Sequence, residues 1–375
     1  MFLHALPFAL AYLMIPSIVI GGVYGGWYLS LPFIVGWGIV PVLDRLTGLN
    51  IRNLDPTLED KDLVWHRAVT LVWVPAQMAL IVWSLWWIGT TDHLSGWEIA
   101  VFALGVGVAT GGTGITFAHE LIHQKPKWER LMGDLLLIST SYGHFATEHV
   151  FGHHITVATP KDPASARRGE SFQAFFARTV LGGIASAWEI DANRLARRGR
   201  PVWHSSNPFW RYGLGWLAFL VLGYVLAGWV GVGFFLLQSF MAIYELEAVN
   251  YIEHYGLTRE YKGNGKFERV HPHHSWNASQ KISNWFLINL QRHSDHHFRP
   301  SRRYPVLQHY PEDEAPQLPL GYAAMIFMAL VPPLWFAVMN KRVDAWRERF
   351  YPHVTDWAPY DNGTIGQEDL TAQAA

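Results

Sequence analysis

Six long apolar stretches dominate the pattern of hydrophobic and polar positions along the 375-residue chain. A helix needs about 20 mostly apolar residues to cross a bilayer, and each stretch is close to that length. Short turns near residue 25, at 90–96 and at 228–233 join the stretches in pairs, which predicts three membrane hairpins. The six predicted spans are 4–24, 27–43, 66–90, 96–118, 212–230 and 232–252.

The distribution of lysine and arginine gives independent support to these hairpins. None of the 29 basic residues lies in the three hairpin turns, so all of them fall on one side of the predicted spans. Cytoplasmic loops of membrane proteins carry an excess of Lys and Arg. This shared side is therefore predicted to face the cytoplasm, with the six spans embedded in the lipid bilayer.

Two more helical segments are expected outside the six spans. Residues 170–190 have the pattern of an amphipathic helix on the membrane surface. The apolar run 318–340 is predicted to be interfacial or re-entrant, because Pro332 and Pro333 break a straight helix. We therefore expect one all-α, membrane-embedded catalytic domain over 1–349, followed by a polar tail or linker at 350–375.

Composition narrows the possible chemistry. The chain contains no cysteine, which excludes disulfides, thiolate metal sites, a catalytic cysteine and a cysteine-ligated iron centre of its own. A net charge of −1 gives no indication of nucleic-acid binding. The 19 Trp, 21 Phe and 15 Tyr suit membrane interfaces. The strongest chemical signal is the uneven placement of the 19 histidines.

Histidines gather in "HELIH" at 119–123, "EHVFGHH" at 148–154 and "LQRHSDHH" at 290–297, all on the predicted cytoplasmic side. Residues four apart share a helix face, so each segment has a pair suited to one metal ion. The second and third segments also contain adjacent histidines, which diverge by about 100° on a helix. This predicts two ions, each bound by one member of each adjacent pair. With His254 after the sixth span, the predicted ligands are His119, His123, His149, His153, His154, His254, His293, His296 and His297.

The spacing does not choose the metal, because imidazole suits iron, copper, zinc and nickel. No catalytic residue is predicted beyond the ligands. Since no carboxylate is among them, both ions are expected to be held mainly by terminal imidazoles. Carboxylates are instead expected to orient the imidazole rings from outside. The candidates are Glu120, Glu148, Glu245, Glu247, Glu253 and Asp295.

Taken together, these segments resemble the motifs of the membrane alkane 1-monooxygenase (alkane hydroxylase) family. The three histidine segments resemble its three boxes, "NYIEHYGL" at 250–257 resembles a fourth motif, and the resemblance covers about 1–340. Two departures are visible: Gln124 stands where Lys is common, and Phe298 where Ala is common. The resemblance implies a fold related to the fatty-acid desaturase and hydroxylase architecture, with a histidine-rich di-iron site.

The resemblance also implies a function. It implies two non-haem iron ions and O2-dependent hydroxylation of medium-to-long n-alkanes to 1-alkanols in the bacterial inner membrane. It further implies that rubredoxin donates electrons and is itself reduced by an NAD(P)H-dependent reductase. Candidates for docking this donor are Arg194, Arg197, Arg198, Arg302 and Arg303, and candidates for shaping a substrate channel are Trp65, Trp73 and Phe117.

Three alternatives compete with this interpretation. The nearest is a membrane di-iron fatty-acyl desaturase or hydroxylase, which would form an alkene or an acyl product. A zinc intramembrane protease would use "HELIH" with Glu120 as base, but it leaves the other histidine segments unexplained. A metal transporter would place its ligands near the bilayer midplane, whereas these lie at the predicted cytoplasmic ends of the spans.

Overall fold

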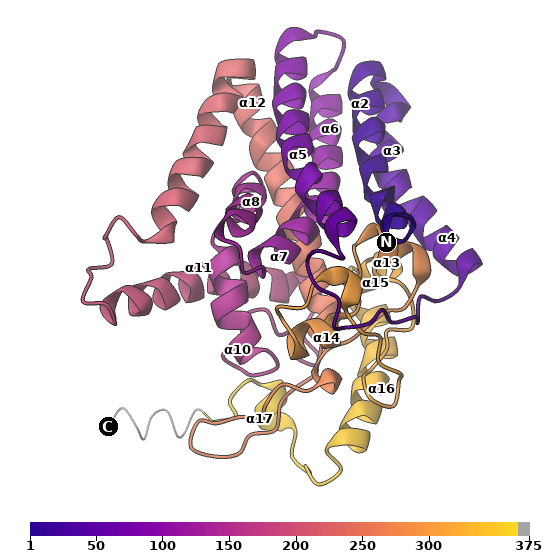
Figure 1. Ribbon diagram of the computed structural model, residues 1–375, viewed down its shortest axis with the longest axis vertical. Coiled ribbons are helices and arrows are strands. Elements are labelled where there is room, and N and C mark those ends of the chain that lie inside the picture. Colours follow the sequence, from indigo (N-terminus) through magenta and orange to yellow (C-terminus); the bar gives the residue numbers. More distant parts are fainter. Residues whose placement is uncertain (367–375) are drawn as a thin grey trace.

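The computed structural model describes residues 1–366, which form helices joined by loops (Figure 1). Five of these helices are long and apolar enough to cross a membrane, and a sixth span results if one strongly bent pair is counted as a single span. The long helices stand side by side at one end of the molecule, and shorter helices and loops gather at the other. The chain thus has the all-α membrane architecture that its sequence predicts.

Each of the first four predicted spans falls within a helical segment of the structure. The first segment is Phe2–Tyr24 and the second is Gly26–Thr47. Within them lie α1 (Phe2–Ala5), η1 (Leu6–Leu13), α2 (Met14–Tyr24), η2 (Gly26–Ser30), α3 (Leu31–Phe33), η3 (Ile34–Ile39) and α4 (Val40–Thr47). The third and fourth segments comprise α5 (Val64–Thr90), α6 (Gly96–Val108), η4 (Ala109–Ile115) and α7 (Thr116–Ile122).

The last two predicted spans belong to the long element α12 (Pro208–His254), which folds back on itself. Ala227 and Gly228 leave the helical conformation, and Gly228 has a positive φ of 59° that favours glycine. The two limbs lie so close that a Cβ on Gly223 would come within 2.9 Å of the Gly231 carbonyl oxygen. Figure 1 shows the limbs diverging from this bend. The third hairpin is therefore present, and its turn begins one residue before the predicted 228–233.

Glycines in the fourth span allow it to pack closely against α12. A Cβ on Gly107 would come within 2.5 Å of the Met241 Cβ, and one on Gly111 within 2.8 Å of the Ala242 Cα. Small residues commonly permit such close helix contacts in membranes. Gly107 and Gly111 thus serve close helix packing, and Gly111, in the π-helical turn η4, also lines a pocket described below.

Helices outside the spans surround the base of the bundle. The predicted amphipathic helix corresponds to α11 (Phe172–Ala196), whose buried residues Phe172, Phe175 and Thr179 recur every three to four positions. Figure 1 shows α11 lying across the direction of the spans. The segment between the fourth span and α11 forms α8 (Lys127–Ile138), α9 (Phe145–Glu148), η5 (His149–His153) and α10 (His154–Thr156).

The C-terminal third covers the base from the other side. The apolar run predicted to be re-entrant contains α15 (Tyr322–Ala329) and the first half of α16 (Pro332–Phe350), and these two helices are bent by 119° at the residues between them. Beyond it, Tyr351 and Tyr360 are buried, while residues 367–375 of the predicted tail lie outside the described part of the chain. The elements are η6 (Pro272–His274), α13 (Lys281–Phe286), α14 (His293–Phe298), η7 (Tyr304–Val306), α15 (Tyr322–Ala329), α16 (Pro332–Phe350) and α17 (Ala358–Asp361).

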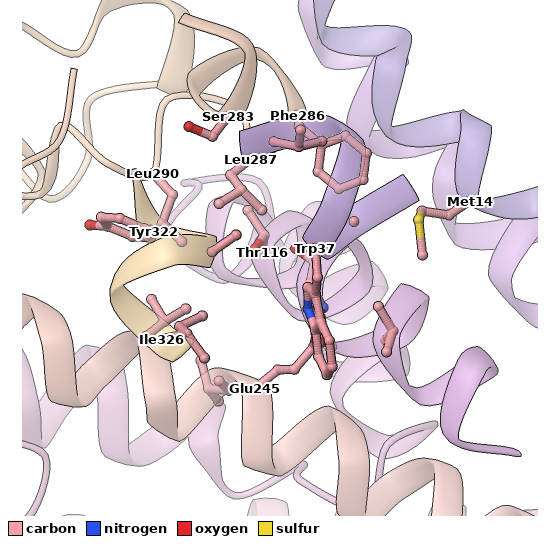
Figure 2. A pocket seen from close by; sticks show the side chains of 18 residues that line it. Met14, Trp37, Thr116, Glu245, Ser283, Phe286, Leu287, Leu290, Tyr322 and Ile326 are labelled. Carbon is pink, nitrogen blue, oxygen red and sulfur yellow. Dashed lines mark hydrogen bonds between the residues drawn. The ribbon is translucent and has the colours of Figure 1, made fainter. Parts of the chain in front are cut away.

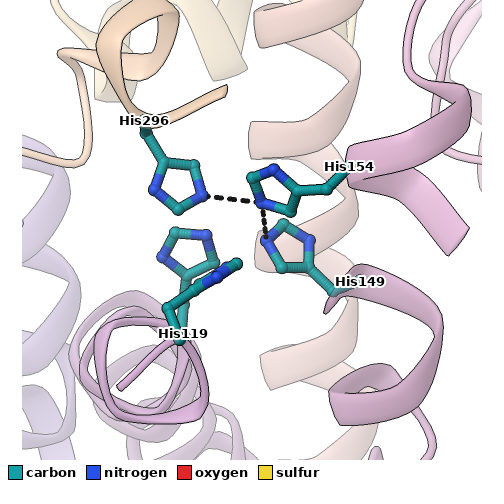
Figure 3. A group of neighbouring side chains, drawn as sticks. His119, His149, His154 and His296 are labelled. Carbon is teal, nitrogen blue, oxygen red and sulfur yellow. Dashed lines mark hydrogen bonds between the residues drawn. The ribbon is translucent and has the colours of Figure 1, made fainter. Parts of the chain in front are cut away.

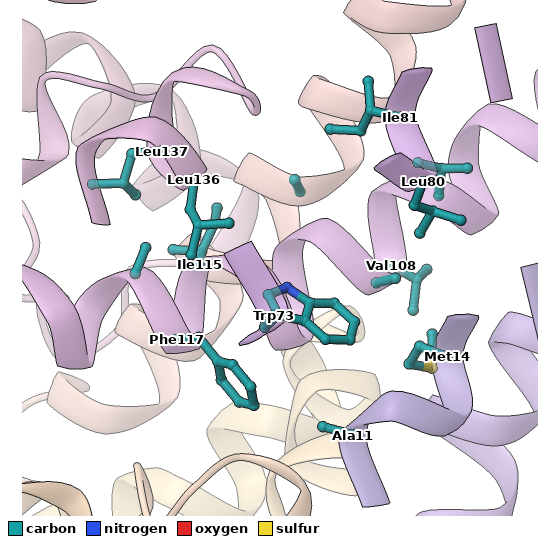
Figure 4. Packing of buried hydrophobic residues seen from close by; sticks show 14 of the residues in the cluster. Ala11, Met14, Trp73, Leu80, Ile81, Val108, Ile115, Phe117, Leu136 and Leu137 are labelled. Carbon is teal, nitrogen blue, oxygen red and sulfur yellow. The ribbon is translucent and has the colours of Figure 1, made fainter. Parts of the chain in front are cut away.

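Two apolar cores hold the base of the bundle in place. The larger one lies among the spans and α8, where Trp73 packs edge-on against Phe117 with ring centroids 5.6 Å apart (Figure 4). The smaller one joins the end of α12 to α15 and α16 through Tyr251 and Trp335. Between them, the ends of α7 and α12 are fixed where the histidine segments meet.

Candidate metal centre

The structure brings all nine predicted histidine ligands together at the base of the bundle. They form two adjoining groups, within each of which the nitrogen atoms offered lie within 4.8 Å of one another. The first group contains five histidines and the second contains four. The five-histidine group is His119, His123, His149, His154 and His296, and the four-histidine group is His153, His254, His293 and His297.

In the five-histidine group, side chains from α7, η5, α10 and α14 converge (Figure 3). The Nε2 atom of His154 lies 3.1 Å from that of His149 and 2.9 Å from that of His296. The Nε2 atoms of His119 and His123 are buried and have no hydrogen-bond partner. A neutral imidazole carries one N–H, so His154 cannot satisfy both neighbours, and nitrogen lone pairs remain directed into the group.

The four-histidine group has the same character. The Nε2 atom of His297 lies 3.2 Å from that of His153 and 2.9 Å from that of His293. His293 in turn is 3.1 Å from His254 through the same atoms. Imidazole nitrogens held at about 2.1 Å from a common ion stand about 3 Å apart. The spacing and chemistry of both groups therefore fit metal ions bound through Nε2.

The second histidine segment departs from regular helical spacing. His149 and His153 are four residues apart and were expected to share one ion, yet they belong to different groups. The reason is that η5 is π-helical, so residues five apart lie on one face. His149 therefore pairs with His154. The adjacent pairs His153-His154 and His296-His297 divide between the groups as the sequence predicts.

One carboxylate, Asp162, orients a predicted histidine ligand, although the carboxylate itself was not predicted. Asp162 Oδ2 lies 2.9 Å from His153 Nδ1 and accepts a hydrogen bond from the Ser165 hydroxyl. Burial alone would raise the pKa of Asp162, but His153 and the Ser165 hydroxyl hold it below its usual value. The ionised carboxylate keeps the proton of His153 on Nδ1, which leaves Nε2 free to bind a metal. Asp162 lies in a loop, so the helical spacing that predicted the histidine ligands could not predict this residue.

Two of the six carboxylate candidates lie against the histidine groups. Glu253 Oε1 is 3.3 Å from His293 Nδ1 and accepts a hydrogen bond from the Tyr322 hydroxyl. Glu148 is buried in α9, one residue before His149, and its Oε1 has no hydrogen-bond partner. Glu253 therefore contacts a histidine of the four-histidine group, while Glu148 is the chain neighbour of one in the five-histidine group, and neither carboxylate belongs to the groups themselves.

The other four carboxylate candidates have different partners. Glu120 accepts hydrogen bonds from the Gln124 side chain and the Tyr304 backbone. Asp295 accepts two hydrogen bonds from Arg302 at 2.6 Å, which braces the loop after α14. Glu245 and Glu247 both lie in α12. Glu247 accepts hydrogen bonds from Tyr142, Thr179 and Asn250, and Glu245 accepts them from Trp37 and the Gly112 backbone.

A third set of acidic and histidine side chains, Glu268, His273 and His274, lies apart from the two groups. His274 Nδ1 accepts a hydrogen bond from the His271 backbone N–H, so the proton of the neutral ring sits on Nε2. That N–H faces the Tyr351 hydroxyl at 2.7 Å. A protonated nitrogen cannot bind a metal, and this set forms a hydrogen-bonded network instead.

Comparisons with known proteins agree with this geometry. A family model described as fatty acid desaturase matches residues 95–329. Alkane 1-monooxygenase 2 of Pseudomonas aeruginosa is 43% identical over 320 residues, covering 83% of each chain. Alkane 1-monooxygenase 2 of Alcanivorax borkumensis is 41% identical and covers 87% of this chain and 84% of its own. The chain belongs to the alkane 1-monooxygenase family.

A further relative, alkane 1-monooxygenase 1 of Pseudomonas aeruginosa, is 40% identical over 85% of this chain and 84% of its own length. Membership in the alkane 1-monooxygenase family, together with the two converging groups, identifies a histidine-ligated metal centre in a membrane enzyme. The departures at Gln124 and Phe298 lie outside both groups.

An apolar pocket lies next to the five-histidine group of this alkane 1-monooxygenase family member (Figure 2). It encloses about 680 Å³ not filled by protein atoms, its open mouth included. A smaller cavity lined by His119 and His296 shares Thr116 and Leu290 with it. The larger pocket therefore adjoins, across Thr116 and Leu290, the cavity that reaches the five-histidine group. Its lining includes Met14, Trp37, Val108, Glu245, Phe286, Leu287, Tyr322 and Ile326.

None of the three channel candidates is among the residues that line this pocket. Trp73 and Phe117 are buried in the larger core, and Trp65 is 51% exposed beside Phe2. Among the large residues that do line the pocket is Trp37, in the second span. Its aromatic bulk was visible in the sequence, but nothing there showed which face of the span it occupies.

The five arginine candidates for donor docking have different surroundings. Arg303 is 7% exposed and binds Asp60 and Glu129, while Arg302 is tied to Asp295. Arg194 pairs with Asp191, and Arg197 and Arg198 are exposed at the end of α11. The charges of Arg302 and Arg303 thus have internal partners in this member of the alkane 1-monooxygenase family.

Proposed function

We propose that this protein hydroxylates the terminal methyl group of medium-to-long n-alkanes with O2, forming 1-alkanols. The observation that carries the proposal is an apolar pocket that adjoins the five-histidine group, one of two converging histidine groups. The relatives named alkane 1-monooxygenase support the reaction class. The nine histidines would hold two iron ions, which supply the activation of O2 that an inert C–H bond requires.

The protein's own side chains bind and orient the alkane. The pocket is lined mainly by apolar residues, which favours a substrate without polar groups along most of its length. Thr116 and Leu290 line both this pocket and the cavity that contains His119 and His296. An extended chain in this pocket presents one terminal methyl to the five-histidine group, which explains selectivity for the chain end. The burial of the histidines keeps bulk water from this methyl.

Electrons are proposed to come from rubredoxin, which an NAD(P)H-dependent reductase would reduce. The 375 residues contain no cysteine, the usual ligand of iron–sulfur carriers, which is consistent with electrons arriving from a carrier outside these residues. We place the enzyme in the bacterial inner membrane with the histidine groups toward the cytoplasm. The support is that none of its basic residues lies in the three hairpin turns at the opposite side.

The experiment that tests this function uses the purified protein in detergent, loaded with iron, together with rubredoxin, its reductase, NADH and decane. We expect oxygen-18 from labelled O2 in the terminal alcohol. An alkene from decane, or activity with acyl substrates alone, would instead favour a desaturase or acyl hydroxylase. Failure of rubredoxin to support turnover, when a chemical reductant does, would refute the proposed donor.

The pocket also predicts which residue limits chain length. The Trp37 indole lines the pocket. It is held there by a hydrogen bond to Glu245 and by an edge contact with the Phe327 ring, whose centroid is 5.6 Å from its own. Replacing Trp37 by serine should extend the pocket and raise the kcat/KM ratio of hexadecane to octane by about tenfold. Trp86→Ser, which removes a 47% exposed indole from α5, is the control. An unchanged ratio in Trp37→Ser would refute this role.

A further inference from the structure

Glu245 is a carboxyl group built into an otherwise apolar substrate pocket. It is only 6% exposed and lies on the limb of α12 that ends at His254. Its Oε1 accepts a hydrogen bond from Trp37 Nε1 at 2.8 Å, and its Oε2 accepts one from the Gly112 backbone N–H at 3.0 Å. Figure 2 shows Glu245 and Trp37 meeting at the edge of the pocket. No basic side chain is among the residues lining it.

The carboxyl group retains unused hydrogen-bonding capacity. A carboxylate offers about four lone-pair directions, and two are used by Trp37 and Gly112. If protonated, the group instead has a hydroxyl that requires an acceptor. Acidic residues inside membrane segments are unfavourable and usually functional. In either protonation state, Glu245 is suited to a polar group that enters the pocket, and a hydroxyl can act as both donor and acceptor.

Glu245 also stands at a distance from the histidines along the two helices that hold it. It precedes His254 by nine residues on α12, and its partner Gly112 precedes His119 by seven on the fourth span. At about 1.5 Å per residue, both helices place the carboxyl group roughly 10–14 Å from the histidine ends. The pocket covers the part of this separation from Glu245 to Thr116, and the smaller cavity lined by Thr116, His119 and His296 covers the rest. An extended chain can therefore reach from His119 to Glu245.

We propose that the pocket also binds medium-chain 1-alkanols, with the hydroxyl group on Glu245, and that the protein hydroxylates their far methyl group to give α,ω-diols. This proposal rests on the proposed alkane hydroxylation. One methyl C–H bond breaks and one C–O bond forms. The methyl carbon is oxidised, and O2 is reduced with two electrons from the same protein donor and two protons. One oxygen atom enters the diol and the other leaves as water.

Glu245 has a structural role as well, because it braces Trp37 and the π-helical turn η4. A loss of activity on mutation would not separate the two roles. The position of oxidation does, since a disturbed fold slows oxidation at both ends of the substrate. With decanol as substrate, binding of the hydroxyl to Glu245 gives the diol, whereas the reversed orientation gives decanal. The diol-to-decanal ratio is therefore the informative measurement.

The test uses iron-loaded holoenzyme with the donor system and decanol. For the wild type we expect the diol as main product. Glu245→Leu should lower the diol-to-decanal ratio by at least about tenfold, while Glu245→Gln, which can still hydrogen-bond a hydroxyl, should stay within about threefold of the wild type. Glu247→Gln is the matched control, because Glu247 lies two residues away in α12 but does not line the pocket. Its ratio should equal that of the wild type.

A second comparison needs no variant and therefore does not depend on the folding of Glu245→Leu. The methyl ether of decanol keeps the chain but cannot donate a hydrogen bond, so its far end should be hydroxylated with a kcat/KM about tenfold lower. Decanal as the main wild-type product, or equal rates for alcohol and ether, would overturn the proposal while decane hydroxylation still stands. Failure to hydroxylate decane itself would overturn the proposed function and this inference with it.

Discussion

Replacing His254 by alanine is expected to remove about one of two bound irons and to lower alkane hydroxylation by more than about 100-fold. His254 contributes one of only four imidazoles in its group, and its Nε2 lies 3.1 Å from that of His293. Loss of a partner behind a ligand already costs about 10–100-fold in metal affinity or activity, and loss of a ligand should cost more. Iron per chain and the rate of alcohol formation measure both effects.

The control for this variant is His204→Ala, since His204 is partly exposed and belongs to neither group. It should keep the iron content and activity of the wild type. The five-histidine group should also keep its ion in His254→Ala, because all five of its side chains remain. Wild-type iron content in His254→Ala would contradict the assignment of this residue to the second ion.

Asp162→Ala should have the next largest effect. The carboxylate holds His153 through Nδ1 at 2.9 Å and is itself held by Ser165. Without it, His153 loses its fixed orientation and tautomer, so iron affinity of the four-histidine group should fall about 10–100-fold. Titration of the apoprotein with ferrous iron should show one weakened site and one unchanged site. Hydroxylation should recover in part when iron is added in excess.

Asp313→Ala serves as the control for this prediction, because Asp313 is exposed and is not among the metal-binding residues. Asp162→Asn should be milder than Asp162→Ala, because the amide oxygen still accepts a hydrogen bond from Nδ1. Equal weakening of both sites in Asp162→Ala would indicate a general disturbance of the fold. Two unchanged sites would show that His153 needs no support from this carboxylate.

The membrane spans follow from the sequence because hydrophobic length and the placement of basic residues act over whole segments. Each predicted span lies in a helix, and the turn at Ala227 and Gly228 is found one residue from the predicted start. The clustering of histidines could also be predicted from the sequence, because His119 and His254 lie at the ends of predicted spans, where α7 and α12 reach the base of the bundle.

Features that depend on local departures from α-helical geometry, or on tertiary contacts, could not be predicted from the sequence. The π-helical turn η5 places His149 and His153 in different groups, and nothing in the amino-acid sequence distinguishes a π-helical turn from an α-helical one. Asp162 reaches His153 from a loop. Trp37 lines the pocket because its indole N–H donates a hydrogen bond to Glu245, which is 208 residues away in the chain. Such pairings arise only when the helices pack.

The most direct test of the central claim is the metal content of the purified, detergent-solubilised wild-type protein, measured per chain together with Mössbauer spectra of iron-57-enriched samples. The account predicts close to two irons in two distinct, nitrogen-rich environments, because one group offers five imidazoles and the other offers four. A single zinc per chain, or one iron with no second environment, would contradict it.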